Sequence, residues 1–397
     1  MLAAIVLVIA LLGVLAWRWA PVARDRAAEV AASSTTVDEA NDVASGVPPR
    51  GPRAAAPAPN AADPATDPRQ ARCNRQRTQQ LRLAQERLRN PANPEQAIQH
   101  ALLSQMLAML VPAADAEASA RAVGVEWRAA RRRWPDSLEL AWSSMRSCNQ
   151  ALGCDPDAEW KHLATLDPDN AAVWMEAMEL ATRRHDDSAY DEALHRAATA
   201  KFHDSRIGTT FLHLQPLLGS LPRPDSCRNP SDVAELTGLL GHVPSDMEWT
   251  GVEASSLELA FGMPGYGSLS GCALEAPAMS AQRRRDCVAL LPRIAAGYTL
   301  LEDNVALRYL IPLAGDGAEG VALRERYRRL RWLFTQIPRA HMPRDYFSRL
   351  WADGEIALLT EAAIAQHRWP PPPDWLPEDE RGRSLVVNGN VPPEHRH

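Results

Sequence analysis

The sequence predicts an all-α fold, and two observations carry that prediction. Hydrophobic residues make up 46% of the 397 residues and charged residues 23%, which is enough apolar material for a sizeable core. Apolar residues recur at helical spacing, most clearly at Leu323, Tyr327, Leu330 and Phe334, whereas runs that alternate as in a β-strand are scarce. Helices are therefore expected throughout the body of the chain.

The N-terminal segment predicts a membrane anchor. Residues 1–17, MLAAIVLVIALLGVLAW, are apolar, and Trp17, Arg18 and Trp19 are residues that suit a headgroup boundary. About 20 apolar residues cross the hydrocarbon core, so residues 1–23 are expected to form a transmembrane signal-anchor helix in the inner (cell) membrane. The alternative is a cleaved signal peptide. The lack of a basic start and the bulky Trp17 after the small residues disfavour it.

Residues 24–72 predict a disordered stalk. The segment is rich in Ala and Pro and lacks large apolar residues, so no burial there offsets the conformational entropy lost on folding. At the other end, residues 369–397 begin with a run of prolines and finish polar, which predicts an extended, Pro-rich polar tail. Trp369 and Trp375 are expected to dock the start of this tail onto the body.

Amphipathic segments of helical length fill the region between stalk and tail, and prolines separate several of them. Helices are expected near residues 75–90, 94–112, 116–134, 137–149, 158–166, 170–184, 187–201, 205–219, 231–241, 250–262, 280–313 with breaks, 317–337 and 343–368. Breaks are expected at Pro135, Pro168, Pro216, Pro292, Pro312 and Pro338. Residues 73–230 are taken as one helical domain and residues 231–368, which show no period, as a second helical region.

Two similar phrases suggest a repeat. RRWPDSLELAW and TLDPDNAAVW place Pro135 and Pro168 33 residues apart, each followed by Asp and then by an N-cap residue. Trp142 and Trp174 follow the two prolines. A third echo, FHDSR, puts Asp204 about one period further on.

The second of these units reads as two short helices, AVWMEAMELA and SAYDEALHRAATA, with TRRHDD turning between them. It resembles the tetratricopeptide-type repeat, a helix hairpin of about 34 residues. Pro168, Trp174, Tyr190 and Ala193 carry the resemblance, which covers residues 135–220 at most. It implies stacked helical hairpins, a TPR-like solenoid, that bind a protein or peptide on a concave surface. An unrelated α-hairpin with a similar phrase is the alternative.

The chain contains six cysteines: Cys73, Cys148, Cys154, Cys227, Cys272 and Cys287. Two couples are close in sequence, Cys148–Cys154 and Cys272–Cys287, and each is expected to form a disulfide. The remaining two pair by elimination, although six cysteines allow about 15 pairings. Disulfides and a long stalk favour a periplasmic body. The arginines just after the anchor favour the cytoplasm instead, where the thiols would be reduced.

Sequence motifs for chemistry are scarce. The only glycine-rich stretch, GMPGYGSLSGC at residues 262–272, lacks a preceding strand and a following Gly-Lys-Ser, and Pro264 has no N–H for a phosphate. It is expected to be a surface loop held by a disulfide. His195 is expected to pair with Asp191 on its own helix. The arginine-rich run 324–332 is expected to form the solvated side of a packed helix, with anionic headgroups as the alternative contact.

No catalytic, cofactor or metal site is predicted, because the sequence contains no HExxH, CxxC or G-x-S-x-G. A net charge of −6 offers no electrostatic attraction for nucleic acid. The expected function is that of a non-enzymatic, membrane-anchored helical-repeat scaffold for protein–protein interaction in the cell envelope. The alternatives are an envelope hydrolase whose site is assembled from distant residues, and a cytoplasm-facing adaptor.

Overall fold

The computed structural model describes residues 68–110, 115–148, 154–262, 264–276, 279–296, 299–337 and 342–391. These residues form helices and no β-strand, which confirms the all-α prediction, and one isolated bridge joins Asn170 to Phe202. The expected anchor at residues 1–23 and nearly all of the stalk lie outside the described residues. Within the described ranges, no helix combines the length and apolar character needed to cross a membrane.

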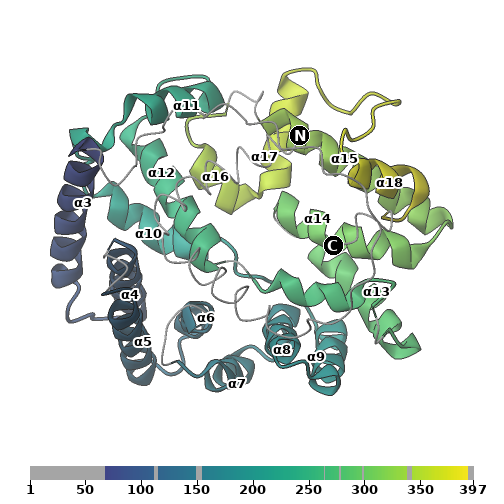
Figure 1. Cartoon of the computed structure of the whole chain (residues 1–397), viewed down its shortest axis with the longest axis horizontal. Helices are drawn as coiled ribbons and strands as arrows, with labels where there is room; N and C mark the ends of the chain where they lie inside the picture. The colour runs from purple at the N-terminus through teal and green to yellow at the C-terminus, as the bar shows by residue number, and fades with distance from the viewer. Residues whose placement is uncertain are drawn as a thin grey trace, which may run out of the picture.

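The α-helices follow one another with short connections, and Figure 1 carries their labels. In chain order they are α3 (Pro68–Arg87), α4 (Pro94–Met109), α5 (Ala116–Arg133), α6 (Leu138–Cys148), α7 (Pro156–Leu166), α8 (Ala171–Arg183), α9 (Asp187–Thr199), α10 (Thr209–Gly219), α11 (Pro230–Leu240), α12 (Asp246–Leu257), α13 (Ala281–Ile294), α14 (Leu300–Ala314), α15 (Ala318–Gln336), α16 (Tyr346–Asp353), α17 (Glu355–Ala365) and α18 (Glu380–Asn388). Three shorter elements join them: η3 (Asp225–Cys227), the π-helical η4 (Glu258–Gly262) and η5 (Tyr266–Cys272).

The helices from α4 to α9 pack on one another in chain order, and α13, α14 and α15 continue the series after α9. Figure 1 shows this series running along the lower edge of the molecule and up one side. The intervening segment lies on the inner side of the series, where α10 contacts α4 and α6, η4 contacts α6, and η5 contacts α8 and α14. The chain therefore fills much of the inner side of its own helical array.

Side-chain caps start most of the helices, as the sequence pattern predicts. Asn170 accepts from the N–H of Ala172 at the start of α8, and Asp186 accepts from Ala189 at the start of α9. Thr299 and Glu302 form a reciprocal capping box at the start of α14. These local interactions explain why the expected helix positions match the structure closely.

The prolines behave differently from the expectation at three of the six sites. Pro216, Pro292 and Pro312 lie inside α10, α13 and α14 instead of breaking them. Each lies in the last turn of its helix, where the missing N–H removes one intrahelical bond and few residues follow to be disrupted. Pro135 and Pro168 do lie between helices, and Pro338 lies outside the described residues.

The hydrophobic core consists of three clusters of buried residues. The largest runs from Ala171 to Leu385, and the second joins α3, α4 and α5 to α10 and α12. Both include residues on either side of position 230, so the boundary expected there does not separate two cores. The third, around Trp142 and Leu163, holds α6, α7 and α8 together.

The C-terminal segment is more ordered than the expected polar tail. It contains α18, whose Leu385 is fully buried in the largest cluster. The start of the segment docks as predicted, since the Trp375 and Trp332 rings meet edge to face at 5.1 Å and Trp369 packs on the core. Because its apolar residues are few and closely spaced, Leu385 and Val386 did not stand out in the sequence as a helix face.

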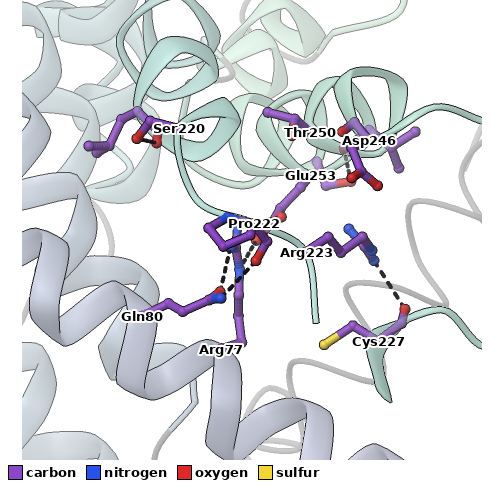
Figure 2. A network of polar contacts seen from close by, with 12 residues as sticks. Arg77, Gln80, Ser220, Pro222, Arg223, Cys227, Asp246, Thr250 and Glu253 are labelled. Carbon is purple, nitrogen blue, oxygen red and sulfur yellow. Dashed lines mark hydrogen bonds and ion pairs between the residues drawn. The ribbon is translucent and has the colours of Figure 1, made fainter. Parts of the chain in front are cut away.

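All three expected disulfides are present: Cys73–Cys227, Cys148–Cys154 and Cys272–Cys287, with Cα–Cα distances of 4.8, 5.4 and 5.7 Å. The first attaches α3 to η3. Figure 2 shows the polar contacts beside it, where Arg77 of α3 forms an ion pair with Glu253 of α12 at 2.8 Å and Arg223 donates to the carbonyl of Cys227 at 3.3 Å. The Cys73–Cys227 bond therefore lies beside an ion pair that joins α3 to α12, two helices whose residues belong to the second cluster.

Candidate functional site

The residues that define the repeat come together at the turns between hairpins. The indole N–H of Trp142 donates to the Asp167 carboxylate at 3.4 Å, and the indole N–H of Trp174 donates to the carbonyl of Pro168 at 2.8 Å. Pro135 begins the turn before α6, and its carbonyl lies 2.8 Å from His162. The two tryptophans therefore attach α6 and α8 to the same turn, which contains Asp167 and Pro168.

Tyr190 and Ala193 lie on the buried face of α9, both 5% exposed. The Tyr190 hydroxyl donates to the carbonyl of Ser268 in η5 at 2.8 Å, and burial raises the pKa of Tyr190 above its usual range. Here the structure corrects the expectation of a surface loop at residues 262–272. Tyr266, Leu269 and Cys272 are buried, and the segment packs against α8.

The glycines of this segment permit that close packing. A Cβ at Gly271 would collide with the hydroxyl of Tyr190, and one at Gly265 would lie 2.9 Å from Cγ of Glu179. Their absence of a side chain lets η5 approach α8 and α9 closely. The glycine-rich stretch therefore has a packing role, and the sequence could not reveal it because Tyr190 is 78 residues from Ser268.

An open pocket of about 690 Å³ remains between α14, α15 and the start of α17. Most of the residues that line it are apolar or lack a charge: Ala296, Leu330, Leu333, Gly354, Ile356, Ala357, Thr360 and Trp369. Four charged residues complete the lining: Asp303, Arg326, Arg329 and Asp353. A mostly apolar wall with a few polar groups is the usual character of a ligand- or peptide-binding pocket.

The charged residues of the pocket have partners within the chain. Asp303, 3% exposed, accepts from Arg326 at 2.5 Å, and Arg329 pairs with Glu325 at 2.8 Å. Asp353 pairs with Arg349 at 2.8 Å. Burial raises the pKa of Asp303 to about 6, against the attraction of Arg326. Oδ1 of Asp303 is buried and has no hydrogen-bond partner in the described part of the chain.

A second layer of polar groups holds the pocket walls in place. The Glu355 carboxylate, at the start of α17, accepts from the N–H of Leu300 at the start of α14, at 2.8 Å. Glu302 accepts from the Tyr266 hydroxyl at 2.8 Å. Burial raises the pKa of Glu355 to about 7, opposed by the Leu300 N–H and reinforced by Glu302. These contacts join α14, α17 and η5 behind the pocket.

A buried charged group lies deeper, where α6, α8 and η4 meet. Arg146, 5% exposed, donates to the carbonyls of Ser205 and Arg206. Burial raises the pKa of Glu176 to about 7 and that of Glu258 above its usual range, and Arg146 opposes both shifts. Glu258 also accepts from the N–H of Phe211 at 3.1 Å, so it stabilises the start of α10.

The sequence singled out neither Asp303 nor Trp369 as pocket residues, nor Arg326, which it had placed on the solvated side of a helix. One signal was available, since the T-x-x-E capping box at Thr299–Glu302 marks the helix start that positions Asp303. The expected pairing of His195 with Asp191 is also corrected. His195 lies 3.3 Å from Asp286, and Asp191 pairs with Arg283. Both partners are on α13, which sequence spacing could not indicate.

The candidate site is thus an apolar pocket whose charged residues are ion-paired. The hydrogen bond between Glu355 at the start of α17 and Leu300 at the start of α14 holds its walls together. Within the described ranges, no group of three or more His, Cys, Asp or Glu side chains is arranged to hold a metal ion. No protein-family model, no curated protein and no solved structure matches this chain.

Proposed function

We propose that the chain is a membrane-anchored, non-enzymatic helical-repeat scaffold that binds a protein partner in the cell envelope, and that the α14–α15–α17 pocket receives an apolar segment of that partner. The observation that carries the proposal is the composition of the pocket wall. Leucine, isoleucine, alanine and tryptophan side chains line it, and the charged residues at it are held in internal ion pairs. Such a surface gains free energy by burying apolar groups of a partner.

The position of the pocket differs from the concave repeat surface that the sequence suggested. Residues of α10, η4 and η5 pack against α4, α6 and α8 on the inner side of the array. A partner that binds where the array remains open meets α14, α15 and α17 instead. The hairpins α6–α7 and α8–α9, which we take as tetratricopeptide-like units, then serve as the rigid support of the site.

The proposed location is the periplasmic face of the inner membrane, with residues 1–23 as a single-pass anchor. Three disulfides support a body on the oxidising side. In the rival topology, a cytoplasm-facing adaptor, the six cysteines would be thiols. The alkylation experiment in the Discussion separates the two.

Two alanines on α17 provide a matched test of the pocket. Ala357 lines the pocket and is exposed, and Ala365 is exposed on the same helix but does not line the pocket. A photo-reactive residue at position 357 of the full chain in its membrane is expected to crosslink a defined partner, and one at 365 is not. Ala357→Arg, which fills the pocket, should abolish co-purification of that partner, whereas Ala365→Arg should leave it. Equal crosslinking at both positions, or unchanged co-purification of Ala357→Arg, would count against the pocket.

A hydrolase is the second candidate, because one observation favours it. Asp303 is a buried carboxyl in a pocket, with a pKa of about 6 and an oxygen that lacks a partner in the described ranges, which are properties of a general acid or base. Asp303→Asn keeps the shape of the side chain. It should leave partner binding intact and abolish any hydrolytic activity of the chain toward ester or peptide substrates. Hydrolysis that persists in this variant would remove Asp303 from consideration.

A further inference from the structure

Three arginines from different helices gather beside the α14–α15–α18 junction. Arg308 is on α14, Arg331 on α15 and Arg381 at the start of α18, and these three helices contact one another in pairs. Figure 1 shows α15 and α18 next to each other, with α14 on their inner side. Their Nε atoms are all buried, and none has a hydrogen-bond partner in the part of the chain that the structure describes.

In the described part of the chain, one carboxylate forms an ion pair with one of these three arginines. Asp379, the N-cap of α18, accepts from Arg331 at 2.7 Å and also from the N–H of Gly382. Within the described ranges, Arg308 and Arg381 take part in no ion pair. Three guanidinium groups and one carboxylate leave an excess of two positive charges in a partly buried place. An excess of this kind is unfavourable unless an anion is bound.

The neighbouring groups strengthen this reading. Burial lowers the pKa of Arg381, and the charge of Arg308 lowers it further. Tyr327 is 1% exposed, and burial raises its pKa above the usual range, while the charges of Arg331 and Arg308 oppose the rise and that of Asp379 adds to it. The contacts centre on Arg331, whose guanidinium pairs with Asp379 and lies 6.0 Å from the centroid of the Tyr327 ring. The helices α14 and α18 bring Arg308 and Arg381 to the same junction.

We propose that Arg308, Arg331 and Arg381 form a binding site for a dianionic phosphate, either free phosphate or the phosphomonoester of a larger ligand. A phosphomonoester presents three terminal oxygens and free phosphate four, each with up to two negative charges near neutral pH, which matches three guanidinium donors with a net excess of two. The site is distinct from the pocket of the proposed function, and it does not depend on that function. The same chemistry has two sources: a soluble phosphate and the phosphomonoester headgroup of the phospholipid phosphatidate.

The test uses the full chain in micelles of an uncharged detergent, with inorganic phosphate as the probe. Titration calorimetry and thermal unfolding are followed at constant ionic strength, so that screening of surface charges does not change. Saturable binding and a phosphate-dependent rise in Tm are expected. In Arg308→Gln and in Arg381→Gln, binding should weaken at least about tenfold and the rise in Tm should disappear.

The control is Arg121→Gln, which removes an exposed arginine whose partner is Glu117 on the same helix. This variant should bind phosphate as the wild type does. A folding defect is distinguished by the ligand-free Tm. Removing one of two like charges should leave the Tm of Arg381→Gln equal to or above that of the wild type.

The lipid source is tested by adding phosphatidate to the same micelles, with phosphatidylcholine as the neutral comparison. Binding of phosphatidate alone, lost in Arg381→Gln, supports the site with a lipid headgroup as its ligand. Binding of free phosphate, lost in the same variant, supports a soluble ligand. The proposal is overturned if neither probe binds saturably, or if Arg308→Gln and Arg381→Gln bind as tightly as Arg121→Gln.

Discussion

Asn170 and Asp204, 34 residues apart, hold each other by two hydrogen bonds. The N–H of Asp204 donates to Oδ1 of Asn170 at 3.0 Å, and Nδ2 of Asn170 donates to the carbonyl of Asp204 at 2.9 Å. Asn170 also donates to Asp167 and caps α8, and it is fully buried. The Pro-Asp-Asn phrase thus starts one hairpin and joins it to the turn one repeat later.

Asn170→Ala should lower the free energy of unfolding by about 2–4 kcal/mol, because it leaves the partly buried N–H of Asp204 and the buried Asp167 carboxylate with fewer partners. Ser137→Ala is the matched control at the preceding turn. Ser137 accepts one bond, from the N–H of Leu140 at 3.4 Å, so its loss should cost about 0.5–1 kcal/mol. Urea unfolding of both variants checks the order. Equal effects would mean that Asn170 acts only as a cap.

Gly271→Ala tests the close approach of η5 to α9. The new Cβ meets the Tyr190 hydroxyl, and the resulting strain should lower stability by about 1–3 kcal/mol. Gly238→Ala, in the interior of α11 with open space around its position, should raise stability by about 0.5–1 kcal/mol. The two Tm values should therefore shift in opposite directions. A neutral Gly271→Ala variant would show that η5 can move away from α9 without loss.

The buried carboxyl of Glu176 predicts a pH dependence of stability. Its pKa in the folded protein is raised to about 7 from 4.5. The contribution of this group is present below about pH 4.5 and is lost as the pH rises through about 7. Glu176→Gln stays neutral, so it should be more stable than the wild type at pH 8, by up to about 3 kcal/mol, and similar to it at pH 4.5.

Urea titrations at the two pH values measure this difference. The control is Glu235→Gln, which alters an exposed carboxylate on α11 and should give the same stability difference at both pH values. A difference for Glu176→Gln that does not change between pH 4.5 and pH 8 would show that its carboxyl is charged or solvated throughout the range.

Membranes lysed in the presence of an alkylating agent should yield a chain with no free thiol, because all six cysteines are paired. Six alkylated cysteines would reject the periplasmic placement. In the purified protein, replacing Cys73 and Cys227 by Ser should lower stability by about 5 kcal/mol, and replacing Cys148 and Cys154 by about 2 kcal/mol. The difference follows from the sequence separations of 154 and 6 residues.

Local patterns in the sequence predicted the helices well, for reasons visible at α8 and α9. Both begin at Asn or Asp caps that act on amides two or three residues away, so a short phrase contains all the information needed. The prediction that Pro216 and Pro292 break helices was wrong, because the rule that proline breaks a helix ignores how near the helix end the proline lies. The sequence also indicated the Cys148–Cys154 and Cys272–Cys287 bonds, because the two cysteines of each pair are only 6 and 15 residues apart.

The pocket required information that no local pattern contains. Asp303 and Arg326 are 23 residues apart on different helices, and Trp369 comes from a third segment. Periodicity shows that Leu330 is on an apolar face, but it does not show which face of α14 or α17 meets it. The sequence could not reveal the cluster of Arg308, Arg331 and Arg381 either, because these residues lie on three different helices. One of them, α18, lies in a segment that we expected to be a polar tail.

The Cys73–Cys227 bond encloses the whole of the Cys148–Cys154 bond in the sequence. If the body is exported as proposed, Cys73 emerges first and meets Cys148 long before Cys227 is available. Oxidation in order of appearance would join Cys73 to Cys148 and Cys154 to Cys227, which is not the native pairing. Correct assembly therefore requires either that the short Cys148–Cys154 loop closes first or that an isomerase reshuffles the bonds. Under that proposal, the order in which the disulfides close, and not the packing of the helices alone, decides whether the native pairing forms.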